Sequence, residues 1–304
     1  MSTTRRSIDF RRIFHPSDFT ETSLVSFAHA LKLAVSARAH LTILHTGDTR
    51  KTASWSEFPR VRKTLENWKL LPEGSAAADI ADLGLEVSKV ILPFADPARS
   101  IVRYLHRHPH DLIVLSTHQH DGLKRWIHDP VAEPIARESG ELTLFVPHNA
   151  EGFVSTSDGS VRLRNILIPV DSTPDPRLSV KAATAITEVF GCRNAVVTLL
   201  HVGDEKVFPE CFLPETEAIQ WKQKSRPGPI TSDILRTAEE IHADLVVMST
   251  HGHDGFLDAL RGSNTERVIR HSPCPVLAVP SYIAREPVVS TLEQLATGKL
   301  TISL

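Results

Sequence analysis

Short apolar runs alternate with amphipathic segments along most of the chain. In the second half, the apolar runs are residues 165–170, 195–202, 217–223 (the weakest), 244–250 and 275–280. Segments with helical periodicity lie between several of them, at residues 176–190, 231–242 and 264–272. This alternation favours a parallel sheet, because neighbouring parallel strands need a long crossover, which a helix provides. The pattern predicts an α/β fold with helices on both faces of the sheet.

The same order of segments occurs twice. "DLIVLSTHQHDG" at residues 111–122 matches "DLVVMSTHGHDG" at residues 244–255, an offset of 133 residues (244 − 111). In both halves this match is preceded by two others, which pair "HPSDF" with "IPVDS" and "LTILHTGD" with "VTLLHVGD". Similarity that recurs in the same order indicates an internal repeat of one structural unit.

We predict two tandem doubly wound domains, each a five-stranded parallel sheet of Rossmann-like type, docked as an internal pseudo-dimer. The predicted bounds are 1–148 for the first domain, 149–163 for a linker, 164–282 for the second domain and 283–304 for a C-terminal tail. The linker stands where Gly, Ser, Asn and Asp accumulate and apolar periodicity is lost.

The two halves differ most after their second strand. The first half has a predicted helix within residues 54–71, flanked by Trp55 and Trp68. The second half has only the shorter segment "EKVFPECFLPET" at residues 205–216. One half has therefore lost or gained an element at this place.

Composition excludes several classes of protein. A formal charge of -2 and a pI near 6.8 provide no broad basic surface for nucleic acid. The N-terminus lacks the apolar core of a signal peptide, and no apolar run approaches the length of a membrane span. The three cysteines have no CxxC spacing and indicate a reducing compartment. We expect a cytoplasmic protein that binds neither nucleic acid nor membrane.

One loop of the second half has the features of a phosphate site. Gly252 follows the strand at residues 244–250, and Gly262 and Ser263 precede the helix that begins at Asn264. Ser263 and Glu266 have the spacing of a capping box. A helix N-terminus preceded by glycine presents free amides to an anion. The alternative is that the glycines only permit turns and that Ser263 is an ordinary cap.

These residues resemble the ATP-binding pattern of the universal stress protein family, Gly-x2-Gly-x9-Gly-(Ser/Thr). Here Ser249-x2-Gly252-x9-Gly262-Ser263 matches it, with Ser249 in place of the first glycine. The likeness extends over nearly all of each half, including "ILIPVDS", "ADLVVMSTHG" and "GSNTERVIRHSPCPVLAVP". It implies a tandem member that binds ATP, with Mg2+ bridging the phosphates, and that has a regulatory or stress-response role.

The resemblance also implies which residues contact the nucleotide. Some would frame the adenine and ribose at the strand ends, and the others would line the phosphates. The first group comprises Pro169, Val170, Asp171, Val202, Met248 and Ser249, and the second Gly252, His253, Gly262, Ser263 and Asn264. From spacing alone, Asp171 is instead a turn aspartate. In the family the last strand makes the dimer contact, which here implies pairing of residues 141–147 with 275–280.

The first half carries a degraded copy of the loop. In the same frame, Gln119 replaces Gly252, Asp129 replaces Gly262 and Pro130 replaces Ser263. A carboxylate at a phosphate site repels the ligand, and proline lacks an amide hydrogen. We therefore predict one ATP per chain, held by the second half only, while the first half has a structural or partner-recognition role.

Two alternatives remain open. The doubled HxHD motif suggests a metal site from His118, His120 and Asp121, or from His251, His253 and Asp254, although neither has a convincing fourth ligand. Slow ATP hydrolysis is the other alternative, but no general base is identifiable. His45 and His201 are predicted to be buried or strand-end residues. A protein partner is expected but not identified, and a homodimer is possible.

Overall fold

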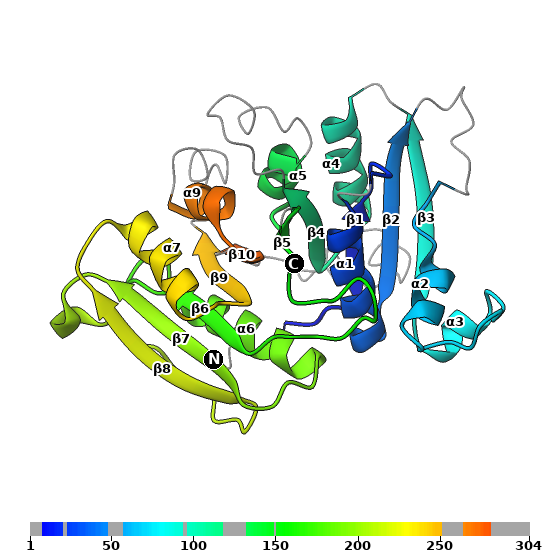
Figure 1. The fold of residues 1–304 in the computed structure, drawn as a ribbon. Coiled ribbons are helices and arrows are strands. Elements are labelled where there is room, and N and C mark those ends of the chain that lie inside the picture. Colours follow the sequence, from blue (N-terminus) through cyan, green and yellow to red (C-terminus); the bar gives the residue numbers. More distant parts are fainter. Residues whose placement is uncertain are drawn as a thin grey trace, which may run out of the picture.

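The structure is a computed structural model of the 304-residue chain. It describes residues 8–20, 23–47, 57–93, 96–117, 132–148, 150–250 and 264–280. Figure 1 shows one continuous twisted sheet with helices on both faces. The predicted α/β class is confirmed.

The first half of the chain alternates strands and helices, as its apolar pattern predicts. Its elements are β1 (Arg12–Pro16), α1 (Leu24–Ala37), β2 (His40–Gly47), α2 (Val61–Asn67), α3 (Asp79–Asp82), β3 (Glu86–Pro93), α4 (Pro97–Arg107), β4 (Leu112–Thr117), α5 (Ala132–Ser139) and β5 (Leu142–Pro147). The start of α4 shows how local sequence sets an element: Asp96 accepts a hydrogen bond from the Arg99 amide, and Pro97 takes the first helical position.

The second half repeats the strands and most of the helices. Its elements are β6 (Asn165–Pro169), α6 (Arg177–Val189), β7 (Ala195–Val202), the short 3-10 helix η3 (Glu205–Val207), β8 (Ile219–Arg226), α7 (Ile230–Glu240), β9 (Leu245–Thr250), α9 (Asn264–His271) and β10 (Val276–Pro280). Most bounds agree with the predicted ones to within two residues. The exception is β8, which continues three residues beyond the predicted 217–223.

All ten strands form a single sheet in the order β3-β2-β1-β4-β5-β10-β9-β6-β7-β8. Pairing is parallel within each half, and the strand order reverses at β1 in one half and at β6 in the other. The halves join through antiparallel pairing of β5 and β10, with Leu144 opposite Leu277. The predicted contact between the two last strands is thus present, and it makes the two halves one sheet.

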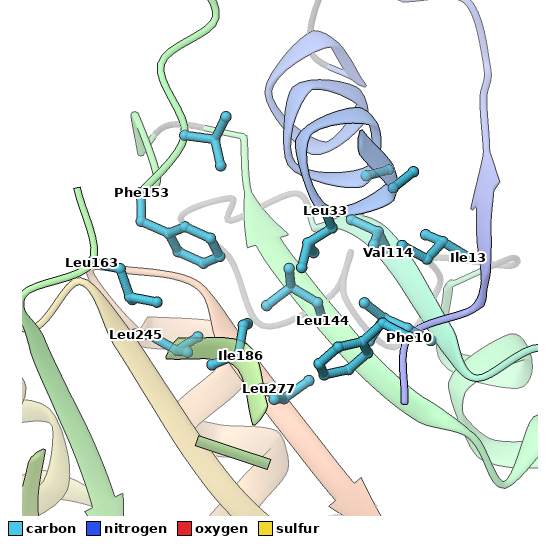
Figure 2. Packing of buried hydrophobic residues seen from close by; sticks show 14 of the residues in the cluster. Phe10, Ile13, Leu33, Val114, Leu144, Phe153, Leu163, Ile186, Leu245 and Leu277 are labelled. Atoms are coloured by element: carbon cyan, nitrogen blue, oxygen red, sulfur yellow. The ribbon is translucent and has the colours of Figure 1, made fainter. Parts of the chain in front are cut away.

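Each face of this sheet has its own apolar core, and both cores run through the two halves. One lies under α1, α2 and α6, and the other under α4, α5, α7 and α9. Figure 2 shows the first core, where Leu144 of β5 lies between Leu33 of α1 and Leu277 of β10. Because these cores cross the β5–β10 junction, apolar burial holds the two halves together.

An aspartate clips two strand starts together in each half. The carboxylate of Asp111, just before β4, accepts hydrogen bonds from the Arg11 and Arg12 amides at 3.0 and 2.8 Å. Asp244, just before β9, accepts hydrogen bonds from the amides of residues 164 and 165 at 2.7 and 2.8 Å. These aspartates begin the two longest matching sequences, so the repeat in sequence is also a repeat in structure.

The helix predicted within residues 54–71 is shorter in the structure. It runs as α2 from Val61 to Asn67, and residues 54–56 lie outside the described part of the chain. Lys69 adopts a positive φ of 57°, which a continuing right-handed helix does not permit. The Leu70 amide then turns back to the Leu65 carbonyl. The helical sequence pattern continues past this point because Leu70 and Leu71 pack against the core without being helical.

The predicted linker is well packed, although its composition suggests otherwise. Phe153 and Val154 are buried, and Val154 forms an isolated antiparallel bridge with Val161. The indole of Trp68 donates a hydrogen bond to the Thr156 carbonyl at 3.1 Å. The linker bounds themselves remain a prediction, but this segment contributes side chains to the core (Figure 2). No helix in the described ranges has the length and apolar character needed to cross a membrane.

Candidate functional site

A cavity of about 330 Å³ lies where β6, β7 and β9 end. Its walls also include the first residues of α7 and α9. The lining residues are Pro169, Val170, Asp171, Thr173, Pro174, Leu200, Val202, Ile230, Ile234, Met248, Ser249, Thr250, Asn264 and Thr265. In doubly wound sheets, ligands bind beyond the carboxyl ends of the strands at the reversal of strand order, and this cavity has that position.

The structure brings together every predicted site residue that it describes. These are Pro169, Val170, Asp171, Val202, Met248, Ser249 and Asn264. The other four, Gly252, His253, Gly262 and Ser263, lie outside the described residues, as do their first-half counterparts Gln119, Asp129 and Pro130. The structure therefore places these seven residues around one cavity, and their role in contacting a nucleotide, like the phosphate loop, stays a prediction.

One wall of the cavity is apolar. Val170 and Met248 are buried, whereas Ile230 at the start of α7 is 42% exposed. A ligand covering Ile230 would remove its apolar surface from water, which favours binding of a flat, partly apolar group such as a base. Ile230 is not among the site residues predicted from the sequence. Its place directly after the Gly228-Pro229 turn, at the first position of α7, was the available signal.

Polar groups at the end of β9 have two different uses. The Ser249 hydroxyl lies 2.7 Å from that of Ser179 and donates a hydrogen bond to the Asp175 carbonyl at 3.3 Å. Ser249 thus ties β9 to the start of α6. The neighbouring Thr250 hydroxyl is buried and has no hydrogen-bond partner among the described residues. A buried, unpaired hydroxyl costs free energy, so Thr250 offers the cavity a hydrogen-bonding group.

Asp171, which follows β6, and Asn264, at the start of α9, both line the cavity. The Asp171 carboxylate accepts a hydrogen bond from the Ser172 amide at 2.7 Å, as a turn aspartate does, and its side chain is exposed. Asn264, the first residue of α9, accepts a hydrogen bond from the Thr231 hydroxyl at 3.0 Å, which joins α9 to α7. Further along α9, Glu266 and Arg270 form an ion pair at 2.8 Å. The helix whose N-terminus is the predicted phosphate site is therefore fixed to its neighbour.

An ionic network holds β8 against α7, the helix that supplies Ile230 to the cavity. Arg226 at the end of β8 pairs with Glu240 at 2.7 Å and donates to the Thr237 hydroxyl at 3.0 Å. Hydrogen bonds from Arg226, and then from Lys224, lower the pKa of Glu240 to about 2. Asp233 is buried in the first turn of α7 and pairs with Arg236. This network is not visible in the sequence, because its members come together only when β8 and α7 pack against each other.

The corresponding strand ends of the first half carry different side chains from those of the second half. His201 uses its Nδ1 to contact the Val170 carbonyl at 3.3 Å, and His45 contacts the Ser17 carbonyl at 2.7 Å in the same way. His201 is buried and His45 half-buried, as expected from the sequence. However, Phe19 corresponds in the repeat to Ser172 of the second half. The Phe19 ring stacks on the His45 ring, with centroids 3.8 Å apart.

Phe19 also contacts the edge of Phe58, with ring centroids 5.0 Å apart. A bulky ring therefore occupies this strand end in the first half. Thr117, the counterpart of Thr250, likewise has a buried hydroxyl without a partner among the described residues. The two halves thus differ in the residues around the strand ends rather than in the strands.

No group of three or more His, Cys, Asp or Glu side chains with the geometry of a metal site occurs within the described ranges. Both HxHD motifs lie outside these ranges. The structure therefore gives no test of the metal alternative.

A doubly wound parallel sheet with a ligand-sized cavity at its strand-order reversal defines the class of the protein: it is an α/β protein with a Rossmann-like fold. The chain belongs to the universal stress protein family, whose model matches residues 9–146 and 210–280.

Similar proteins agree with this assignment. A universal stress protein of Synechocystis is 29% identical over 154 residues, which are 44% of this chain and 95% of that protein. The crystal structure of a universal stress protein from Archaeoglobus fulgidus covers 90% of this chain and 98% of its own, with 20% identity and a TM-score of 0.59.

Proposed function

We propose that the second half binds one ATP per chain, with Mg2+ bridging the phosphates, and that this binding serves a regulatory or stress-response role. The cavity at the ends of β6, β7 and β9 is the observation that supports this most directly. Its volume of about 330 Å³ is at the lower end of the range for small-molecule sites. Its mixed apolar and polar lining suits a base and a ribose.

In this proposal the base lies against Val202, Met248 and Ile230, and Asp171 accepts hydrogen bonds from the ribose. The phosphates extend toward Gly252, Gly262 and Ser263, where a glycine-rich loop meets the N-terminus of α9. Such a loop offers backbone amides and the positive end of the helix dipole to an anion. The sequence carries this part of the proposal.

Restriction of ATP to the second half rests on two contrasts. In the loop, Asp129 and Pro130 replace Gly262 and Ser263. At the strand ends, Phe19 stacks on His45, whereas the second half has a small residue. The first contrast adds a negative charge and removes an amide donor, and the second adds bulk.

Calorimetric titration of the full chain with ATP and Mg2+ tests the proposal. We expect one ATP site per chain. Gly262→Asp introduces the residue that the first half has at the equivalent position, Asp129, and should abolish binding. Gln119→Glu is the matched control, because it adds the same charge to the counterpart loop and should leave affinity unchanged. Two sites per chain, or undiminished affinity in Gly262→Asp, would contradict the proposal.

A second variant tests the cavity separately from the loop. Truncation in Ile230→Ala removes apolar surface worth about 1 kcal/mol, so ATP affinity should fall about fivefold. Leu24→Ala truncates a similarly exposed side chain on α1 and should have no effect. If Ile230→Ala weakens binding but Gly262→Asp does not, the cavity binds a ligand without the proposed phosphate contacts.

A further inference from the structure

The crossover between the second and third strands is built differently in the two halves. In the first half it contains α2 and α3, whereas in the second half residues 203–218 cross with only the short helix η3. Both crossovers pack on the same face of the sheet, since Leu65 of one and Leu213 of the other join the same apolar core. They lie at opposite ends of the sheet, beside the edge strands β3 and β8 (Figure 1).

The first crossover forms a groove of about 860 Å³ against β3. Apolar side chains, among them Phe58, Val61 and Leu85, form part of its lining and are buried. Charged residues also line it: the cations Arg60, Arg62, Lys63 and Lys89, and the carboxylates Glu66 and Glu86. Four cations against two carboxylates leave this groove, which we call the cationic groove, with a net charge of +2 (4 − 2).

Two of these cations lack an ion pair within the part of the chain that the structure describes. Arg62 and Lys63 pair with Glu66 at 3.7 and 3.4 Å, but Arg60 and Lys89 have no carboxylate within 4.0 Å among the described residues. The Lys89 ammonium lies 5.4 Å from the centroid of the Phe58 ring. Partial burial of Lys89 without a compensating charge lowers its pKa. An anion entering the groove would stabilise both cations.

The second crossover has the complementary chemistry. Residues 204–217, which we call the acidic crossover, contain five carboxylates and one lysine, a net charge of −4 (5 − 1). They expose Val207 to 63% and Phe212 to 71%, more than any other large hydrophobic side chain in the described ranges. A large exposed aromatic side chain is typical of an interface anchor.

The structure holds the residues on both sides of Phe212 in place. The indole of Trp221 on β8 donates a hydrogen bond to the Pro214 carbonyl at 3.2 Å. The Phe208 ring lies edge-on to His201 with centroids 5.9 Å apart, and Leu213 packs against the apolar core. Phe212 therefore projects from a segment fixed on both sides, so little conformational entropy would be lost when it docks.

We propose that the acidic crossover of one copy docks in the cationic groove of a second copy, with Phe212 as its apolar anchor. A contact within one chain is excluded, because the two surfaces flank opposite edges of a ten-stranded sheet, about 43 Å apart at about 4.8 Å per strand. The contact is heterologous, since it joins two different surfaces, and it builds a chain or a ring of copies.

Sedimentation of the full-length protein at low salt tests this. Wild type should increase in mass with concentration up to about 100 µM, and added salt should weaken the association because it screens the charges. Arg60→Glu and Lys89→Glu in the groove, and Phe212→Ser in the acidic crossover, should each weaken association about tenfold or more. Arg60 is exposed, so Arg60→Glu remains informative if Lys89→Glu fails to fold. Leu24→Ser alters another exposed apolar side chain and should change nothing.

Mixing the variants distinguishes this contact from any other. The Arg60→Glu copy retains a working acidic crossover, and the Phe212→Ser copy retains a working groove. An equimolar mixture should form pairs and nothing larger, at concentrations where each weakened variant alone is monomeric. A wild type that stays monomeric, an association insensitive to these substitutions, or a mixture that forms no pairs would overturn the proposal. The sedimentation experiment contains no ATP, so its outcome does not depend on the proposed nucleotide site.

Discussion

Replacing His29 on α1 should destabilise the protein strongly at neutral pH and much less in mild acid. The ring is fully buried, and its Nε2 accepts hydrogen bonds from the Phe153 and Val154 amides at 3.0 and 3.2 Å. Because Nε2 is an acceptor, Nδ1 carries the proton and donates it to the Val25 carbonyl at 2.7 Å. A neutral His29 thus fastens the segment between the halves to α1.

The cost of His29→Leu follows from the two amides that lose their acceptor. A buried, unpaired amide costs about 1–3 kcal/mol, so the free energy of unfolding should fall by about 3 kcal/mol or more near neutral pH. Leucine fills most of the space of the imidazole and keeps the contact with Phe153. The ring centroids of Phe153 and His29 are 4.5 Å apart. The loss therefore reports mainly on the hydrogen bonds.

Mild acid should reduce this difference. Burial lowers the pKa of His29 from 6.5 to about 4, so the unfolded chain binds more protons than the folded one between these values. The free energy of unfolding therefore falls as the pH decreases through this window. Between about pH 7.5 and pH 5 the loss from His29 is about 2 kcal/mol. His29→Leu lacks this contribution, although the buried His15 and His110 still provide theirs.

Urea denaturation of wild type and His29→Leu at both pH values measures the two effects. The difference in the free energy of unfolding should shrink by about 2 kcal/mol from the higher to the lower pH. His106→Leu removes an exposed histidine and serves as the control. If the free energy of unfolding depended on pH equally in wild type and His29→Leu, the assignment of His29 as a buried, neutral hydrogen-bond acceptor would be refuted.

Two further predictions follow from the repeat and the sheet. Asp244→Asn weakens the hydrogen bonds between β6 and β9, and Asp111→Asn weakens the equivalent hydrogen bonds in the first half. In urea denaturation each variant should lower the free energy of unfolding by about 1–2 kcal/mol, with similar values for the two halves. A loss in only one variant would show that the two aspartates are not equivalent. Residues 161–304 expressed alone should self-associate in light scattering, because β10 loses its partner β5 and presents an open edge; a stable monomer would count against the role of this junction.

The strands were predictable because each is a short apolar run between turns, and burial in a parallel sheet requires that composition. β8 was predicted least well, because Lys222 and Lys224 are polar residues suited to an edge strand. The end of α2 was not predictable, because it depends on the positive φ of Lys69. Nor was the packing of Phe153, whose ring partners are His29 on α1 and Phe190 directly after α6, far away in sequence.

The candidate site was partly predictable for a topological reason. Strand ends that follow apolar runs meet at one edge of a parallel sheet, so Val170, Val202 and Met248 converge without any further information. The hydrogen bonds and ring contacts of individual side chains were not visible in the sequence. Ser249 is held by Ser179, and Phe19 stacks on a histidine that the repeat also provides in the second half.

The cavity and the acidic crossover are joined through one strand end. Val202 lines the cavity as the last residue of β7, and the acidic crossover begins two residues later at Asp204. We predict that a ligand bound in the cavity shifts the end of β7 and, with it, the segment that carries Phe212. Coupling between two binding events is reciprocal, so ATP should change the self-association constant by the same factor by which self-association changes the affinity for ATP.

Titration of wild type with ATP at low and high protein concentration measures one factor, and sedimentation with and without ATP measures the other. Unequal factors would show that the two measurements do not report on the same pair of sites, and a factor of one in both would show that β7 transmits nothing between them.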